Sequence, residues 1–272
     1  MDKQNAPLLA IKNMRISYLR KSGDEKVIVE NGSFEVNRGE VVIIIGENGS
    51  GKSSVFQSLV RDPRKMDTTK KDSRDLYFKG EKLTDDKIDE FRRCIGYAPQ
   101  EDDLDGLFHP KVWDAVLHSA YLSGKYKNSE LKEMENECNK VFEALNCNTY
   151  ADGEFKKRKI SVCSGGEKRM ATLLSALCRT RSDLFILDEP LNNLDAEHAR
   201  ILNNYLVALT TNLENKEELP GVLIITHCHM FRKHDRVYKL SGGEISDFLN
   251  YEAKSCYGNC ISQCGLYYEE NK

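Results

Sequence analysis

The chain has 272 residues, of which 40% are apolar and 31% are charged. This composition is typical of a globular protein of one large or two small domains, and it excludes a disordered chain. The net charge of −3 gives no electrostatic reason to expect nucleic-acid binding, and no apolar stretch approaches the roughly 18 residues that cross a bilayer.

The first forty residues predict antiparallel strands. The segment Leu8–Tyr18 alternates apolar and polar side chains, which predicts an edge-type antiparallel strand. After a polar turn, Val27–Val36 predicts a second strand pair, interrupted at Asn31-Gly32. Two interpretations of Tyr18 stay open here: an aromatic ring that stacks on a base, or a half-buried side chain of the strand.

The next segment predicts a buried strand followed by a phosphate-binding loop. The run Val41–Ile45 is short and entirely β-branched, as in a strand buried on both faces of a parallel sheet. Gly46–Ser53 fits the pattern G-x-x-x-x-G-K-[ST], in which loop N–H groups and a helix N-terminus surround phosphate oxygens. Lys52 is expected to reach the β- and γ-phosphates, and the Ser53 hydroxyl to ligate Mg²⁺. The alternative is a glycine-rich turn without nucleotide, and the helix-compatible segment Ser53–Val60 argues against it.

The middle of the chain predicts mixed structure followed by helices. Asp75–Leu83 suggests a hairpin, Asp85–Arg93 a short helix and Ile95–Ala98 a strand. From Trp113 to Asn146 the apolar residues recur at helical spacing, which predicts a helical subdomain inserted into an α/β body. The basic run Lys156–Lys159 is expected to be a solvated face.

Two further buried strands end in polar residues. Leu184–Leu187 leads into Asp188-Glu189, and Val222–Ile225 leads into Thr226-His227. Doubly wound sheets place ligands at the carboxyl ends of their strands. Asp188 there suits a Mg²⁺ ligand, and Glu189 is well placed to polarise an attacking water. A surface carboxylate that caps the following turn remains the alternative for Glu189.

The remaining segments predict two helices, Met170–Leu177 and Ala196–Leu209, and a closing strand or hairpin over Arg236–Phe248. Ser241-Gly242-Gly243-Glu244 is expected to be the turn of that hairpin.

The nine cysteines are scattered and odd in number. Because Met1–Ala10 lacks a secretory pattern, we expect reduced thiols in a cytosolic protein. Cys256, Cys260 and Cys264 recur every four residues in the tail. Incidental or structural cysteines, and metal or lipid attachment, both stay open for them.

Taken in order, the motifs resemble those of the nucleotide-binding subunit of an ATP-binding cassette (ABC) ATPase. Seven motifs over about residues 8–248 carry the resemblance: the Walker A loop Gly46–Ser53, the Walker B strand Leu184–Glu189, the signature Ser164–Lys168, the Q-loop Pro99-Gln100, the D-loop Asn192–Asp195, the switch histidine His227 and the base-stacking aromatic Tyr18. The chain departs from the family at Cys163, usually leucine, at Glu167, most often glutamine, and at Asn192-Asn193, often a small pair.

The resemblance implies a fold and a domain organisation. The expected fold class is α/β: a P-loop NTPase core with a mostly parallel sheet, an N-terminal antiparallel β subdomain and an inserted α-helical subdomain. Residues 1–248 would form the ABC ATPase domain, with its helical subdomain at about 101–163. Residues 249–272 would form a cysteine-containing tail.

The resemblance also implies a role for each matched residue. Glu189 would orient and deprotonate the attacking water, His227 would contact the γ-phosphate, and Gln100 would assist catalysis. Mg²⁺ would be ligated by Ser53, Gln100 and Asp188. ATP would be held by Tyr18, Gly46, Asn48, Gly49, Ser50, Gly51, Lys52, Ser53, Ser54, Asp188 and Asp195. Ser164, Gly165 and Gly166 would bind the γ-phosphate of an ATP held by a second subunit.

Because each motif is present once, the resemblance implies a head-to-tail dimer with the same or a homologous chain. The function implied first is an ATPase that powers transport through separate transmembrane subunits, on the cytoplasmic face of a membrane. Trp113 and the acidic segment Glu101–Asp105 lie in the region that would meet those subunits. The alternative is a soluble ABC ATPase without a membrane partner, of the iron–sulfur cluster assembly type or similar.

Overall fold

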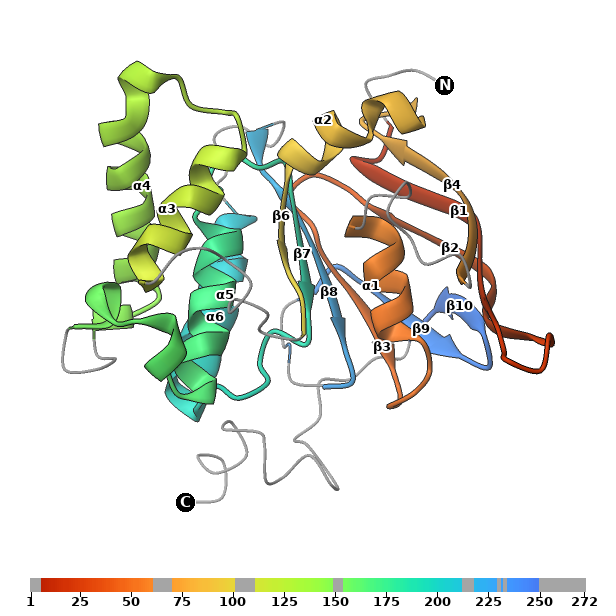
Figure 1. Cartoon of the computed structure of the whole chain (residues 1–272). Helices are drawn as coiled ribbons and strands as arrows, with labels where there is room; N and C mark the ends of the chain where they lie inside the picture. The colour runs from red at the N-terminus through yellow and green to blue at the C-terminus, as the bar shows by residue number, and fades with distance from the viewer. Residues whose placement is uncertain are drawn as a thin grey trace.

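One curled sheet with helices on both sides forms the molecule (Figure 1). The structure, a computed structural model, describes residues 6–60, 70–100, 111–148, 154–211, 218–228, 231 and 234–249. The strands are β1 (Leu9–Leu19), β2 (Glu25–Val36), β3 (Val41–Gly46), β4 (Lys70–Phe78), β5 (Glu81–Lys82), β6 (Ile95–Ala98), β7 (Leu184–Asp188), β8 (Gly221–Thr226), β9 (Arg236–Ser241) and β10 (Glu244–Asp247). The helices are α1 (Lys52–Val60), α2 (Ile88–Arg93), α3 (Val112–Leu122), α4 (Leu131–Ala144), α5 (Gly165–Leu177) and α6 (Ala196–Leu209), with short 3-10 turns η3 (Asp85–Lys87), η4 (Asn128–Glu130), η6 (Phe155–Lys157) and η7 (Ile160–Val162).

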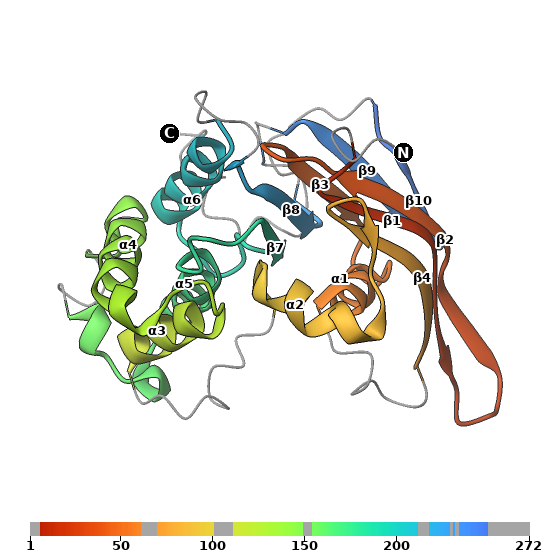
Figure 2. The same cartoon turned by 90° about the horizontal axis from the view of Figure 1, so that it is seen from above.

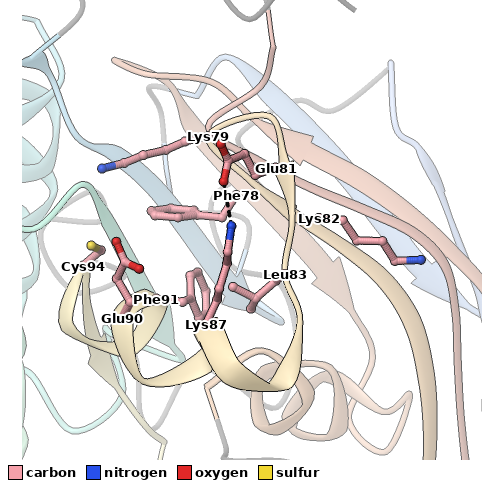
Figure 3. Close-up of a pocket in the computed structure, with 9 residues that line it drawn as sticks. All are labelled: Phe78, Lys79, Glu81, Lys82, Leu83, Lys87, Glu90, Phe91 and Cys94. Carbon is pink, nitrogen blue, oxygen red and sulfur yellow. Dashed lines mark hydrogen bonds and ion pairs between the residues drawn. The ribbon is translucent and has the colours of Figure 1, made fainter.

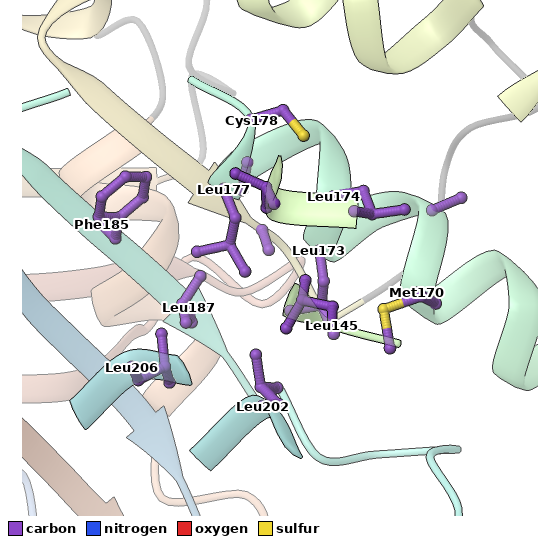
Figure 4. Close-up of a cluster of buried hydrophobic side chains, with 14 of the residues drawn as sticks. Leu145, Met170, Leu173, Leu174, Leu177, Cys178, Phe185, Leu187, Leu202 and Leu206 are labelled. Carbon is purple, nitrogen blue, oxygen red and sulfur yellow. The ribbon is translucent and has the colours of Figure 1, made fainter. Parts of the chain in front are cut away.

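The strands β9-β3-β8-β7-β6 pair in parallel and place β3 inside the sheet. Every residue of β3, β7 and β8 is buried. Alternate side chains of β3 enter two apolar clusters, Ile43 on the face covered by α3 to α6 and Ile44 on the face covered by α1. Figure 4 shows the first cluster, where leucines of α5 and α6 lie near Phe185 and Leu187 of β7. The predicted fold class is therefore confirmed.

The amino-terminal strands form the antiparallel part of the same sheet. β1 pairs with β2 on one side and β4 on the other, so the prediction of an edge strand for Leu8–Tyr18 is wrong. In this part of the sheet β5 lies at the edge. β2 runs without a break, so the predicted interruption at Asn31-Gly32 is also wrong. The residues that suggested a turn are accommodated instead by register shifts against β1, where Met14 pairs with Gly32.

The closing hairpin joins the two parts of the sheet. Ser241 pairs with Glu244, so the two glycines between them form the predicted turn. β10 then pairs in parallel with β2 through two residue pairs, Glu244 with Asn31 and Ile245 with Gly32. The antiparallel strands are thereby connected to the parallel strands in one sheet.

The helices α3 and α4 lie on the opposite side of the molecule from β1, β2 and β4 (Figure 2). The rings of Trp113 on α3 and Phe142 on α4 have centroids 5.8 Å apart. Lys156 Nζ lies 4.2 Å from the centroid of the Trp113 ring and 4.6 Å from that of Phe142. The prediction of a solvated face for Lys156–Lys159 is therefore only partly correct, because the ammonium group of Lys156 contacts two aromatic rings.

Some expectations fall on parts of the chain that the structure does not describe. The acidic segment Glu101–Asp105 and the tail cysteines Cys256, Cys260 and Cys264 lie outside the described residues. The six cysteines inside the described ranges are all buried. Within those ranges, every helix is too short or too polar to cross a membrane.

Candidate functional site

The carboxyl ends of β3, β7 and β8 meet at one edge of the sheet, because these strands are parallel. β3 ends at Gly46, and the loop after it leads into α1 at Lys52. Gly51 in this loop has a φ of +107°, and a Cβ there would lie 2.4 Å from Cγ2 of Ile28. Both the torsion and the close approach require glycine. The loop therefore brings the N-terminus of α1 to the edge where the other two strands end.

Lys52 is charged and yet buried, with only 7% of its surface exposed. Its Nζ donates to the carbonyl oxygens of Gly46 at 2.9 Å and Glu47 at 3.0 Å. It also lies 3.6 Å from Oε1 of Glu189. Because a buried ammonium group needs charge or dipole partners, these contacts hold a positive charge inside the loop, where the pattern predicts phosphates.

Glu189 follows β7, and both of its carboxylate oxygens are held. Oε2 accepts from Oγ1 of Thr226 at 2.8 Å, and Oε1 accepts from the backbone N–H of His227 at 3.0 Å. Nδ1 of His227 lies 2.8 Å from the same Oε1. A carboxylate can only accept, so the proton is assigned to Nδ1 of His227. Glu189 is 3% exposed, which removes the alternative of a surface carboxylate that caps the turn.

Asp188 is also buried, and its Oδ1 has no hydrogen-bond partner among the described residues. Burial and the negative charge of Glu189 raise the pKa of Asp188 to about 7, although the positive charges of Arg169 and Lys52 act in the opposite direction. A buried carboxylate oxygen without a donor is a suitable place for a cation.

Ser53 and Gln100 come together from α1 and from the end of β6. Ser53 Oγ donates to Oε1 of Gln100 at 3.3 Å. Together with the unpartnered oxygen of Asp188, they offer hydroxyl, amide and carboxylate oxygens, the ligand types that Mg²⁺ prefers. The residues present therefore fit the ion. Elsewhere in the described part of the chain, no group of three or more His, Cys, Asp or Glu side chains could hold a metal.

Tyr18 lies beside the start of α1. Its Oη is 3.3 Å from Oγ of Ser54, and either hydroxyl can donate. The ring is half-buried at the end of β1. The structure thus brings Tyr18 next to the phosphate loop, and both interpretations of this residue, base stacking and strand packing, agree with its position.

Two hollows in the described part of the chain lie at opposite edges of the sheet. The first has a volume of about 300 Å³ and is lined by Ile45, Gly46, Glu47, Asn48, His227, Lys239 and Phe248. The second has about 230 Å³ and is lined by Phe78, Lys79, Glu81, Lys82, Leu83, Lys87, Glu90, Phe91 and Cys94 (Figure 3). Cys94 precedes the amino end of β6, whereas the phosphate loop follows the carboxyl end of β3. Only the first hollow therefore belongs to the site.

Ser164 is the N-cap of α5. Its N–H donates to Oε2 of Glu167 at 2.7 Å, and its Oγ accepts from the N–H of Glu167 at 3.3 Å, which forms a capping box. Arg158 pairs with the other oxygen of Glu167, so the glutamate at this family position has a local counter-charge. Ser164 and Gly165 are exposed. The start of α5, which is the positive end of the helix dipole, therefore faces solvent.

The loop before α6 packs against the start of α5. A Cβ at Gly166 would lie 2.8 Å from the carbonyl oxygen of Asn193, so the two backbones are in close contact. Asp195 is the N-cap of α6, where it accepts from the N–H of His198 at 2.9 Å. Nδ1 of His198 lies 2.7 Å from its other oxygen. The carboxylate of Asp195 thus has a structural role beside its predicted contact with nucleotide.

Two residues to which the sequence assigned no role hold this site together. Thr226 binds Glu189 through its hydroxyl, as described above. Arg169 is completely buried on α5 and donates to three carbonyl oxygens, those of Pro99 at 2.5 Å, Asp188 at 2.7 Å and Glu189 at 3.1 Å. In the sequence, Arg169 is marked only as a charged residue at the start of the apolar run of α5, because the residues that it binds are distant in sequence.

Comparisons with known proteins agree with this arrangement. A family model described as "ABC transporter" matches residues 29–192. A putative ABC transporter ATP-binding protein of Archaeoglobus fulgidus is 30% identical over 228 residues, which cover 82% of this chain and 69% of the relative. The energy-coupling factor transporter ATP-binding protein EcfA1 of Streptococcus mutans is 29% identical over 262 residues, 95% of this chain and 84% of the relative. Among solved structures, a dimeric ATP-binding cassette in a post-hydrolysis state with ADP and Pi has a TM-score of 0.69 at 22% identity, and the match covers 87% of this chain and 96% of that one; it supports the fold.

Proposed function

This chain belongs to the ABC transporter family and is an ATPase of that family, and on that premise we propose that it drives transport through membrane-spanning subunits made by other chains. The observation that supports ATP hydrolysis as the driving reaction is the meeting of Lys52, Glu189 and His227 at the carboxyl edge of the parallel strands. Two relatives named as transporter ATP-binding proteins support the transport role. We propose residues 1–248 as the ATPase domain, with a helical subdomain at about 101–163.

In this proposal, ATP binds with its phosphates in the loop and its adenine on the ring of Tyr18. The loop residues that would surround the phosphates are Gly46, Asn48, Gly49, Ser50, Gly51, Lys52, Ser53 and Ser54. Lys52 would exchange its carbonyl partners for phosphate oxygens, since an anionic oxygen is a stronger acceptor than a carbonyl. That exchange also takes the ammonium group away from Glu189, which lies 3.6 Å from it before nucleotide binds.

The proposed base for hydrolysis is Glu189. Thr226 and His227 hold its carboxylate at the end of β7, so that it can orient a water toward the γ-phosphate and accept its proton. With Nδ1 of His227 directed to Glu189, the Nε2 atom of the same ring would contact the γ-phosphate. Gln100, at the end of β6, would assist from the Ser53 side.

Ser53, Gln100 and Asp188 would hold Mg²⁺. When bound, this ion neutralises negative charge on the β- and γ-phosphates. Asp188 must be ionised to take part, and the nearby positive charges of Arg169 and Lys52 favour that form against burial.

We further propose that the second half of each site comes from another copy of the chain or from a homologous chain. The exposed start of α5, with Ser164, Gly165 and Gly166, offers a hydroxyl and a helix N-terminus to the γ-phosphate bound on the partner. Asp195 would lie near the same contact. The two chains would be arranged head to tail, with two ATP molecules between them.

The variant Glu189→Gln tests this arrangement, because glutamine keeps the shape of the side chain but cannot act as a base. We expect ATP turnover to fall by about 100-fold or more, and the protein to form an ATP-dependent dimer on size-exclusion chromatography. The matched control adds Ser164→Asp, which keeps a good N-cap but puts a negative charge toward the partner's γ-phosphate. The double variant should bind ATP and stay monomeric. A Glu189→Gln protein that hydrolyses ATP as a monomer would contradict both roles.

The membrane partner is tested by purification from detergent-solubilised membranes. A protein with several spanning segments that co-purifies with this chain would support the transport role and a position on the cytoplasmic face. Its absence under conditions that preserve the dimer would favour the soluble alternative.

A further inference from the structure

Arg169 connects the signature helix to the catalytic end of β7. Its side chain is completely buried on α5, and its guanidinium donates through Nη1 to Pro99 O and through Nη2 to Asp188 O and Glu189 O. Burying a cation is costly unless dipoles or charges surround it. The planar, fixed fork of the guanidinium allows one side chain to bind separate segments at once.

The three carbonyl groups belong to the two loops that place the reacting groups. Pro99 directly precedes Gln100. Asp188 is the last residue of β7, and Glu189 follows it with a φ of +48°. Such a torsion in a residue other than glycine costs on the order of 1–3 kcal/mol and persists only where the surroundings fix it. Here the N–H of Glu189 is bound by the carbonyl of Ile225 at 2.8 Å, and its own carbonyl is bound by Arg169.

The helix that carries Arg169 begins at the signature. Ser164 is its N-cap, and Arg169 follows five residues later. At 1.5 Å per residue the two lie about 7–8 Å apart along the helix axis. An α-helix of this length moves as a rigid element, so a shift at its N-terminus moves the guanidinium and the three carbonyls that it binds.

We propose that Arg169 is a positioning residue that couples the two nucleotide sites of the dimer. ATP on the partner would engage the start of α5, and Arg169 would transmit the new position of the helix to Gln100 and Glu189 of its own site. This inference rests on the proposed head-to-tail dimer. It predicts that hydrolysis at one site requires the partner's nucleotide even when the first site is filled.

Arg179 provides a matched control. It lies just beyond the carboxyl end of the same helix, is also buried, and donates through Nη2 to two carbonyl oxygens, those of Arg92 at 2.9 Å and Arg93 at 3.3 Å. These carbonyls precede β6, so they lie at the sheet edge opposite to the phosphate loop. Arg179 therefore shares the burial and the bonding of Arg169 but not its position.

The experiment compares Arg169→Lys with Arg179→Lys in the full-length protein. Lysine keeps the charge but cannot span three carbonyls in a fixed plane. For Arg169→Lys we expect kcat to fall by about 100-fold, as for a misplaced reacting group, with the KM for ATP nearly unchanged and the cooperative dependence on ATP concentration lost. For Arg179→Lys we expect lower stability toward urea, with kcat and cooperativity close to wild type.

Arg169→Gln, which keeps two N–H donors, serves as a second variant if lysine does not allow folding. The same loss of kcat and cooperativity in either folded Arg169 variant supports the coupling. Wild-type kcat and cooperativity in a folded Arg169 variant overturn it, while the proposed function stands. A wild-type protein without ATP hydrolysis overturns the proposed function and this inference with it.

Discussion

Replacing Asp188 with asparagine removes the negative charge that burial opposes most strongly in this site. The pKa of Asp188 is about 7 in the folded protein, against an ordinary value of 3.8. Because the pKa of Asp188 is higher in the folded than in the unfolded protein, unfolding releases a proton. The free energy of unfolding therefore decreases as pH rises from about 4 to about 7. At about 1.4 kcal/mol per pH unit, the ionised carboxylate costs the folded state about 4 kcal/mol above pH 7.

Asparagine is neutral at every pH, but its amide N–H needs a partner in the same buried space, and an unmet buried donor costs about 1–3 kcal/mol. The ligand-free variant should therefore be more stable than wild type by about 1–3 kcal/mol at pH 8 and less stable by a similar amount at pH 4. Urea unfolding at pH 4, 6 and 8, without nucleotide or Mg²⁺, measures this difference.

Asp195→Asn is the control, because its effect on stability should change with pH in the opposite direction. Hydrogen bonds from His198 hold the pKa of Asp195 below its ordinary value, against the effect of burial, so its stabilising effect is present above the unfolded pKa and lost as pH falls. This variant should be less stable than wild type at pH 8, and the difference should shrink as pH falls. A stability difference for Asp188→Asn that does not change with pH, or that favours wild type at pH 8, would refute the reasoning about buried charge.

Three shorter predictions concern the loop and the buried thiols. Lys52→Ala should weaken ATP binding by about 100-fold, the loss of a charge-assisted contact of 2–3 kcal/mol, and isothermal titration should detect it; unchanged affinity would remove the phosphate-loop assignment. Gly51→Ala should lower stability toward urea by about 1–3 kcal/mol, because the φ of +107° and the contact with Ile28 exclude a side chain; a fully stable variant would contradict that geometry. Burial raises the pKa of the Cys178 thiol well above its usual range, and its sulfur donates to the carbonyl of Cys138, so Cys138 and Cys178 should react with a maleimide only after unfolding. Peptide mapping identifies the labelled cysteines, and labelling of Cys138 or Cys178 in the native protein at neutral pH would show that this core opens.

Sequence patterns predicted the local elements well, because their causes are local. The β-branched run of β3, the glycine-lysine loop and the period of α4 each depend on neighbours within a few residues. The pairing of β10 with β2 was not predictable in this way, since two residue pairs between positions about 31 and 245 leave no periodic signal. The edge position assigned to β1 failed for the same reason, because its second partner, β4, lies about 60 residues further along the chain.

The predicted site residues gather at one sheet edge, but the groups that hold them came only from the structure. Arg169 binds three backbone carbonyls, and a carbonyl is present at every position, so no residue pattern marks it as a partner. Lys156 failed as a solvated residue for a related reason. The three residues that follow it in sequence are basic, while the rings that it covers come from two other elements.

The antiparallel strands join the parallel strands of the sheet at a narrow junction, where β10 pairs with β2 through only two residue pairs. Further links between the antiparallel and the parallel strands are a hydrogen bond from the N–H of Glu35 to Oη of Tyr238 and an apolar cluster to which both parts contribute. If the adenine stacks on Tyr18, the two ends of the nucleotide contact different parts of the sheet: the adenine contacts the antiparallel part, and the phosphates contact the parallel part. We expect the adenine to lose its contacts first when the product dissociates, and the phosphates to lose theirs last.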